Sequence, residues 1–166
     1  PDEAYLQQLL ADSPELIPWE SIGAEQSEAF VPIREFWHEG VGPSDLVVVH
    51  SSGEVTIVEC KLATNPEARR TVVAQVLDYA ASLTGMDIDT FHERVARKLD
   101  GESLVTVLER NTPSDDFDGS EFEARLRSNI ESGNFALVIA IDEMNDQLSQ
   151  LLEFIDRRSS GALKIY

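Results

Sequence analysis

Runs of apolar residues, some alternating with polar ones, predict the strands of this protein. Residues 45–51 (DLVVVHS) and 54–62 (EVTIVECKL) are rich in β-branched residues and are joined by a short Ser/Gly loop, which predicts a hairpin. Residues 29–37 (AFVPIREFW) favour an extended strand, with its proline at a sheet edge or bulge. Residues 135–141 (FALVIAI) are continuously apolar, which is typical of a strand buried on both faces. Residues 162–166 (ALKIY) predict a last strand.

Helical spacing and capping signals predict the helices. Residues 2–11 place Tyr5, Leu6, Leu9 and Leu10 on one stripe, and Ser13-Pro14 interrupts that helix. Asn65-Pro66 predicts the start of a helix that runs to about Leu83 and is closed by Gly85. The other expected elements are a turn at 40–44, one or two helices within 88–110, an acidic loop at 111–120, and helices at 121–132 and 145–158.

The order of these elements indicates the fold class. A helix, three strands and a second helix are followed by a helical insertion at about 86–133, then a strand, a helix and a last strand. This order predicts an α/β protein whose sheet is flanked by helices. The 166 residues suit a single domain over 1–166. The chain starts at Pro1 rather than at a methionine, which is consistent with a piece of a longer protein.

Composition narrows the choice of partners and compartment. The net charge of −18 argues against nucleic-acid binding by bulk charge, which depends on lysine and arginine. A surface this acidic and this poor in lysine also suits a cytoplasm of high salt, where self-repulsion is screened. Cys60 is the only cysteine, so an internal disulfide is excluded and a cytoplasmic location is expected. No apolar run approaches the ~20 residues that cross a bilayer, so no membrane partner is expected.

The strand at 54–62 carries an unusual pair of charges. Side chains alternate along a strand, so Glu59 and Lys61 share a face with the apolar Ile57. A two-residue loop would place Asp45 on the opposite face from Glu59. A three-residue loop, Ser51-Ser52-Gly53, would pair Asp45 with Glu59 across the hairpin. We expect the three-residue loop, because its last position favours a residue with positive φ, and glycine stands there.

Two carboxylates this close repel each other and require a cation. Paired carboxylate oxygens suit Mg²⁺ or Mn²⁺, which keep several waters that a substrate phosphate can replace. A lysine beside such a metal can orient a water and offset charge on a phosphate oxygen. Asp45, Glu59 and Lys61 therefore predict metal-assisted phosphodiester hydrolysis. The alternative is a set of salt-bridged surface charges at the end of a hairpin.

The next helix contributes two further candidates. Gln75 and Tyr79 are four residues apart, so they stand on one face of the helix, at the margin of its apolar stripe. From there they can reach over the end of the hairpin to a water, a metal ligand or a phosphate. The alternative is that they form the polar rim of a packed helix.

Together, Asp45, Glu59, Lys61, Gln75 and Tyr79 resemble the D…ExK…QxxxY series of the RecB-type branch of the PD-(D/E)XK nuclease superfamily. Residues 43–83 are also similar to an uncharacterised group of bacterial and archaeal proteins in that superfamily, and residues 3–18 resemble the group's N-terminal pattern more weakly. The resemblance implies a restriction-endonuclease-like αβββαβ core with a mixed central sheet flanked by helices. The helical insertion and a C-terminal helix and strand would be additions to it.

The resemblance also implies roles for these residues. Asp45, Glu59 and the backbone carbonyl of Cys60 would bind Mg²⁺, and Lys61 would position the attacking water. Gln75 and Tyr79 would organise the site or the substrate strand. Glu3 stands where such families often place a further metal-binding acid, although the first helix could equally present it to solvent.

Several other residues are weighed against simpler roles. Arg69 and Arg70 could hold substrate phosphates, although solvent exposure explains them equally well. Cys60 points away from the charged face, so we expect it in the core. His38, His50 and His92 lack the spacing of a zinc site. Trp19 and Trp37 are expected to be core or interface aromatics. No nucleotide-motor, dinucleotide or serine-hydrolase motif is present.

The sequence thus favours a Mg²⁺- or Mn²⁺-dependent nuclease acting on nucleic acid, with DNA favoured over RNA. The acidic surface then requires a local basic groove, an additional domain or protein partner, or high salt. The alternative is a non-catalytic interaction or regulatory module on the same fold, for which a homodimer is one possible form. A third idea, mimicry of nucleic acid by the acidic surface, receives no support from the hairpin.

Overall fold

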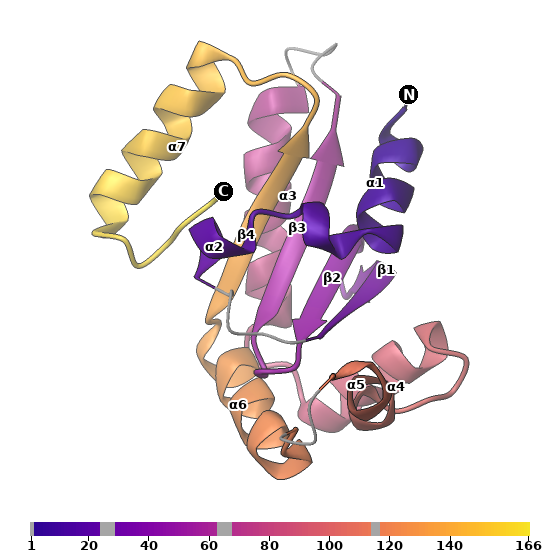
Figure 1. Ribbon diagram of the computed structural model, residues 1–166. Coiled ribbons are helices and arrows are strands. Elements are labelled where there is room, and N and C mark those ends of the chain that lie inside the picture. The colour runs from indigo at the N-terminus through magenta and orange to yellow at the C-terminus, as the bar shows by residue number, and fades with distance from the viewer. Residues whose placement is uncertain (1, 24–28, 63–67, 114–116) are drawn as a thin grey trace.

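The computed structural model describes residues 2–23, 29–62, 68–113 and 117–166, without the side chains of 68–70. Within these ranges the chain forms one mixed four-stranded sheet in the order β1-β2-β3-β4 (Figure 1). Three strands form an antiparallel meander: β1 (Phe30–His38), β2 (Gly42–His50) and β3 (Val55–Lys61). The fourth strand, β4 (Phe135–Ile141), joins parallel to β3. The expected α/β class is confirmed.

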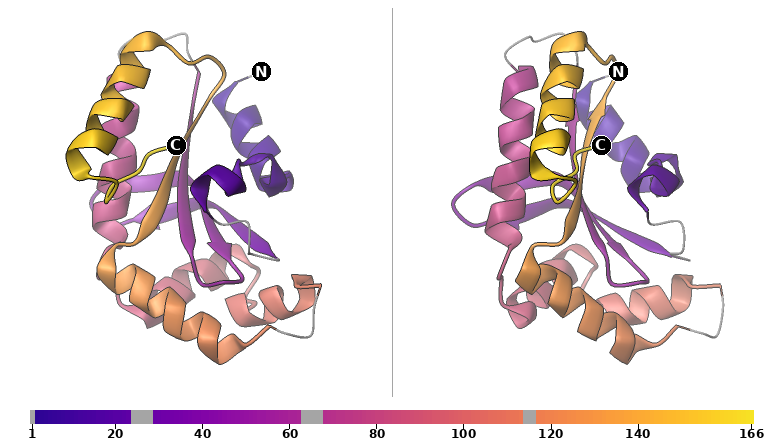
Figure 2. Two further views of the ribbon diagram at one scale, coloured as in Figure 1. Left: turned by 60° about the vertical axis from the view of Figure 1, so that its left-hand side comes forward. Right: turned by 90° about the vertical axis from the view of Figure 1, so that its left-hand side faces the viewer.

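Helices cover both faces and one end of this sheet. α1 (Glu3–Asp12), the short 3₁₀ helix η1 (Pro14–Leu16) and α2 (Trp19–Ile22) lie on one face, and α3 (Ala68–Leu83) lies on the other (Figure 1). Figure 2 shows α7 (Asp146–Ser159) beside α3, and α4 (Ile88–Lys98), α5 (Leu104–Asn111) and α6 (Gly119–Ser132) at the end where β2 turns into β3. No helix in the described ranges has the length and apolar character that a bilayer crossing needs.

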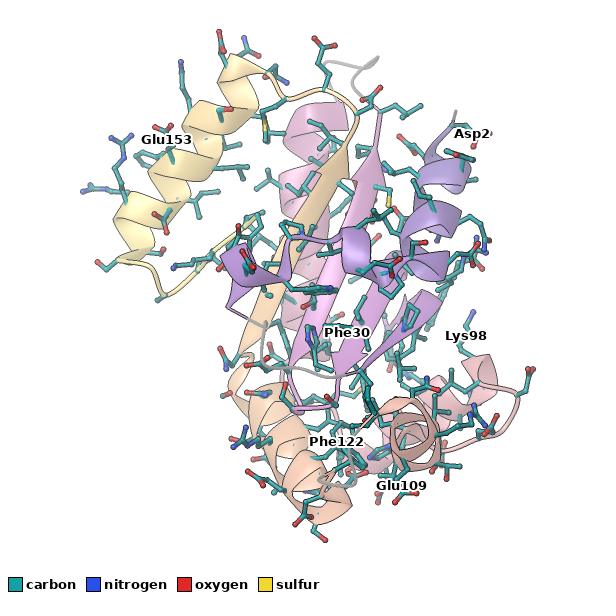
Figure 3. The ribbon with its side chains drawn as sticks, viewed as in Figure 1. Asp2, Phe30, Lys98, Glu109, Phe122 and Glu153 are labelled. Atoms are coloured by element: carbon teal, nitrogen blue, oxygen red, sulfur yellow. The ribbon has the colours of Figure 1, made fainter. Side chains whose placement is uncertain are left out.

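The two faces of the sheet belong to two separate cores. Val47 and Ile57 pack towards α3 in the larger core, whereas Leu46, Val58 and Cys60 pack towards α1 and α2. This division follows from the alternation of side chains along each strand. Cys60 is fully buried among apolar residues, which confirms its expected place in the core. Charged side chains such as Lys98 on α4 and Glu153 on α7 project outwards (Figure 3).

The hairpin between β2 and β3 has the expected three-residue loop. The backbone N–H of His50 donates to the carbonyl of Glu54 at 3.0 Å, and Leu46 stands opposite Val58. Gly53 has a φ of 83°, in the left-handed region that glycine adopts without strain. A Cβ at this position would lie 2.7 Å from the Cβ of Arg125 in α6, so α6 packs directly on the turn. This register carries Asp45 to the position opposite Glu59.

The first helix differs from the expected amphipathic pattern. Tyr5 and Leu9 are 59% and 37% exposed, whereas Gln7 and Leu10 are buried. The helix is rotated because Gln7 binds polar groups of the sheet: its Nε2 donates to the carbonyl of Asp45 at 2.8 Å. An apolar stripe could not indicate that a glutamine faces the sheet.

Two smaller expectations, on the start of β2 and on the last strand, also require correction. β2 begins at Gly42, inside the segment expected to be a turn, because it pairs with the far end of β1. Residues 162–166 form a single parallel bridge, Leu137 with Ile165, rather than a full strand. Trp37 is 57% exposed, unlike Trp19, which is buried against Phe30. The expected cap at Asn65-Pro66 lies outside the described residues.

Candidate functional site

The candidate residues lie at the end of the sheet opposite the β2–β3 turn. Asp45 stands near the start of β2, and Glu59 and Lys61 stand at the end of β3. The first turn of α1 reaches the same end of the sheet (Figure 1). The antiparallel pairing of β2 and β3 therefore brings together residues that are 14 positions apart in the sequence.

Two short contacts fix the charged groups. The backbone N–H of Cys60 donates to Asp45 Oδ2 at 2.7 Å, which holds the aspartate carboxylate against β3. The Nζ of Lys61 lies 3.0 Å from Glu59 Oε1. Glu59 is only 3% exposed, so this ion pair is largely removed from water. A buried carboxylate with a single lysine partner is costly to keep charged.

Burial raises the proton affinity of both carboxyl groups. Burial first, and then the charge of Asp45, raise the pKa of Glu59 to about 7 against the opposing effect of Lys61. Burial also raises the pKa of Asp45, although the Cys60 N–H and the Lys61 charge oppose it. Among the described side chains, Lys61 does not neutralise the negative charge that the hairpin gathers here, and a divalent cation would relieve this repulsion.

Lys61 remains a cation in this setting. Burial lowers its pKa, but the hydrogen bond and charge of Glu59, followed by the charges of Glu3 and Asp45, outweigh burial and raise the pKa above the ordinary lysine value. An ammonium group donates hydrogen bonds and cannot accept a proton. Lys61 is therefore suited to orienting a water or stabilising negative charge, and unsuited to acting as a base.

Gln75 and Tyr79 face this site from α3. Tyr79 donates its hydroxyl to the carbonyl of Pro43 at 3.0 Å, and Gln75 lies one helical turn before Tyr79 on the same face of α3. Burial, followed by the charges of Glu59 and Asp45, raises the pKa of Tyr79, because the ring lies close to both carboxylates. The five candidate side chains from β2, β3 and α3 therefore come together.

The first helix contributes from the other side. Glu3 Oε2 lies 3.6 Å from the Nζ of Lys61, and its Oε1 accepts a hydrogen bond from the backbone N–H of Leu62 at 3.3 Å. Glu3 thus contacts the end of β3 rather than lying free in solvent. Gln7, which supports the backbone of Asp45, is a site residue that sequence reasoning missed. No local signal distinguished it, because Gln7 lies beside the apolar stripe of the first helix rather than within it.

The side-chain oxygen atoms at this site resemble, in part, the ligands that a divalent metal prefers. Two buried oxygens, Glu59 Oε2 and Gln75 Oε1, accept no hydrogen bond from any described N–H or hydroxyl group. Oxygen atoms without donors are the ligands that Mg²⁺ and Mn²⁺ prefer. Among the described residues, however, no group of three or more His, Cys, Asp or Glu side chains is placed to hold a metal. A metal here would bind two carboxylates and complete its shell with carbonyl oxygen and water.

Arg69 and Arg70, the expected phosphate-binding residues, fall in the first turn of α3. Their side chains lie outside the part of the chain that the structure describes.

Comparison with known proteins gives no relative for this chain. No protein-family model, no curated protein and no solved structure matches it.

Proposed function

We propose that this protein is a metal-dependent nuclease domain of the PD-(D/E)XK type, which hydrolyses phosphodiester bonds of nucleic acid with Mg²⁺ or Mn²⁺. One observation carries the proposal: Asp45 and Glu59 come together across the hairpin, Glu59 buried and Asp45 half-buried, with Lys61 3.0 Å from Glu59. Burial of two like charges beside one lysine is costly for stability. Such an arrangement is typical of sites built for a cation.

The order of elements supports the proposal. A helix, three antiparallel strands, a helix and a strand parallel to the third succeed one another, as in the αβββαβ core expected from the resemblance. Helices α4, α5 and α6 lie between α3 and β4, where a helical insertion was expected. They lie at the end of the sheet where β2 turns into β3, away from the last residues of β3 (Figure 1).

The residues divide the chemistry among them. Asp45, Glu59 and the carbonyl of Cys60 would hold the metal, which when bound supplies a more acidic water and positive charge beside the phosphate. Lys61, as an ammonium ion, would orient the attacking water and stabilise the charge that develops on the phosphate oxygens. Tyr79 would keep the start of β2 in place through the carbonyl of Pro43. The amide of Gln75 would present its oxygen to a water or to the substrate strand.

Cleavage assays test this proposal. Single- and double-stranded DNA and RNA are incubated with the protein and Mg²⁺ or Mn²⁺, at low and at molar salt. We expect cleavage that requires the metal and that Lys61→Ala abolishes, whereas Lys98→Ala, at an exposed lysine of α4, retains it. Absence of cleavage by the wild-type protein under all these conditions would contradict the proposal.

A second candidate is a non-catalytic interaction or regulatory module with the same fold. The net charge of −18 favours it, because a nucleic-acid partner is repelled by such a surface. The ion pairs of Lys61 with Glu59 and Glu3 also fit a purely structural role. The two candidates differ in whether a divalent metal binds.

A further inference from the structure

His38, at the end of β1, is a fully buried polar residue. Regular alternation from Ile33 would place His38 on the face of the sheet that points away from α3. Glu35 has a φ of 51°, in the left-handed region that non-glycine residues rarely adopt. This distortion reverses the alternation, so that Ile33 and Phe36 both belong to the core on the α3 side. His38 follows Phe36 to that side, and the β1–β2 hairpin extends past α3 (Figure 2).

The hydrogen bonds of His38 identify its tautomer. Ser82 in α3 donates its hydroxyl to the carbonyl of Tyr79 at 2.9 Å, so its oxygen is left to accept a hydrogen bond from His38 Nδ1, 2.8 Å away. Nδ1 therefore carries the proton. The bare Nε2 then accepts from the hydroxyl of Ser44 at 2.9 Å.

These bonds form a directed chain from β2 to α3. Ser44 donates to His38, His38 donates to Ser82, and Ser82 donates to Tyr79. The His38 and Tyr79 rings also stack, with centroids 4.7 Å apart. Tyr79 closes the arrangement by donating its hydroxyl back to Pro43. The two residues before Asp45 are thus each tied to α3, one directly and one through His38.

We infer that His38, as the neutral Nδ1–H tautomer, is a positioning residue that holds Pro43 and Ser44 against α3 and so fixes the carboxylate of Asp45 beside Glu59. The inference rests on the proposed function only in taking Asp45 as a metal ligand. The fixation of Asp45 itself is a property of the metal-free protein.

The surroundings keep this histidine neutral. Burial, followed by the charge of Arg94, lowers the pKa of His38 to about 4, although the Tyr79 backbone opposes this. At neutral pH the ring therefore carries one proton. A protonated ring would donate from both nitrogens and could no longer accept from Ser44.

Two NMR measurements on the metal-free protein test the inference. The imidazole ¹⁵N shifts of His38 should show the Nδ1–H tautomer at neutral pH. The Cys60 amide donates to Asp45, so its hydrogen exchange should become faster in Ser44→Ala and in His38→Ala. The increase should exceed, at least severalfold, the increase that the loss of global stability in each variant predicts. His50→Ala is the matched control, because His50 is also fully buried and binds a hydroxyl, Thr56 Oγ1 at 2.9 Å, but lies at the other end of β2.

Mn²⁺ binding adds the functional readout. We expect Ser44→Ala and His38→Ala to weaken binding about tenfold, the range found for residues that orient metal ligands, and His50→Ala to leave it unchanged. An Nε2–H tautomer, or unchanged Cys60 exchange in both variants, would overturn the inference whether or not the protein binds metal. If the tautomer and the Cys60 exchange are as expected but the wild-type protein binds no Mn²⁺, the proposed function fails and the positioning role of His38 stands.

Discussion

Asp45 accepts a hydrogen bond from the backbone N–H of Cys60 at 2.7 Å, so the side chain of one strand caps the end of its neighbour. This contact predicts different outcomes for two substitutions. Asp45→Asn keeps an acceptor oxygen and removes the repulsion with Glu59, whereas Asp45→Ala leaves the Cys60 N–H without its partner. Loss of such a partner costs about 1–3 kcal/mol. Urea unfolding at pH 8 should therefore show Asp45→Asn at least as stable as the wild-type protein, and Asp45→Ala less stable.

Glu59 is expected to lower the stability of the metal-free protein at alkaline pH. The pKa of Glu59 is raised to about 7 in the folded protein, against about 4.5 in the unfolded chain. The stability that comes from protonation of Glu59 is therefore fully present below pH 4.5 and is lost as the pH rises through 7. Glu59→Gln should therefore raise the free energy of unfolding at pH 8 by about 1–3 kcal/mol. The gain should disappear near pH 4.5 in the same denaturant titration. A variant less stable than the wild-type protein at pH 8 would contradict the electrostatic account of the site.

His50 gives the opposite pH dependence. Burial lowers its pKa to about 4 from an ordinary value of 6.5, so the folded state excludes a proton that the unfolded chain binds. The stability linked to the neutral ring is complete above pH 6.5 and falls as the pH drops towards 4. The destabilisation by His50→Gln should thus be largest above pH 6.5 and should shrink by about 2–3 kcal/mol near pH 4. Denaturant unfolding of both proteins between pH 4 and 8 measures this difference, and a constant difference would refute it.

The hairpin register depends on Gly53. Alanine there must adopt a positive φ and would place its Cβ 2.7 Å from Arg125 Cβ and 2.9 Å from the backbone of α6. Gly40 also has a positive φ, 76°, but a Cβ at that position would meet no atom within 4 Å, so Gly40→Ala carries only the conformational cost of about 1 kcal/mol. We expect Gly53→Ala to lower the thermal midpoint clearly more than Gly40→Ala does. Equal effects would mean that contact with α6 does not constrain the turn.

Local patterns in the sequence were sufficient to predict the hairpin register, two of the strands and the place of Cys60. The three-residue loop followed from the preference of Gly53 for positive φ, and that loop alone determined which residues oppose each other. The apolar runs identified β3 and β4 because buried strands leave a continuous signal. Cys60 was assigned to the core by simple alternation.

Other features depend on tertiary contacts that no local pattern records. Gln7 occupies a buried position because it binds the Asp45 carbonyl, which lies 38 residues away. His38 is buried only because the backbone at Glu35 reverses the strand. Residues 162–166 have strand propensity, but only Ile165 forms a bridge to β4. At Gln7 and His38, both next to the site, long-range polar contacts override local propensity.

Mn²⁺ binding, measured by calorimetric titration of the wild-type protein and of Asp45→Asn at pH 8, tests the central claim most directly. Asp45→Asn keeps the hydrogen bond from Cys60 but removes one charged ligand, so a loss of binding cannot be ascribed to unfolding. We predict one saturable site in the wild-type protein and at least a tenfold weaker site, or none, in the variant. Wild-type protein that binds no Mn²⁺, or a variant that binds it equally well, would contradict a metal site formed by Asp45 and Glu59.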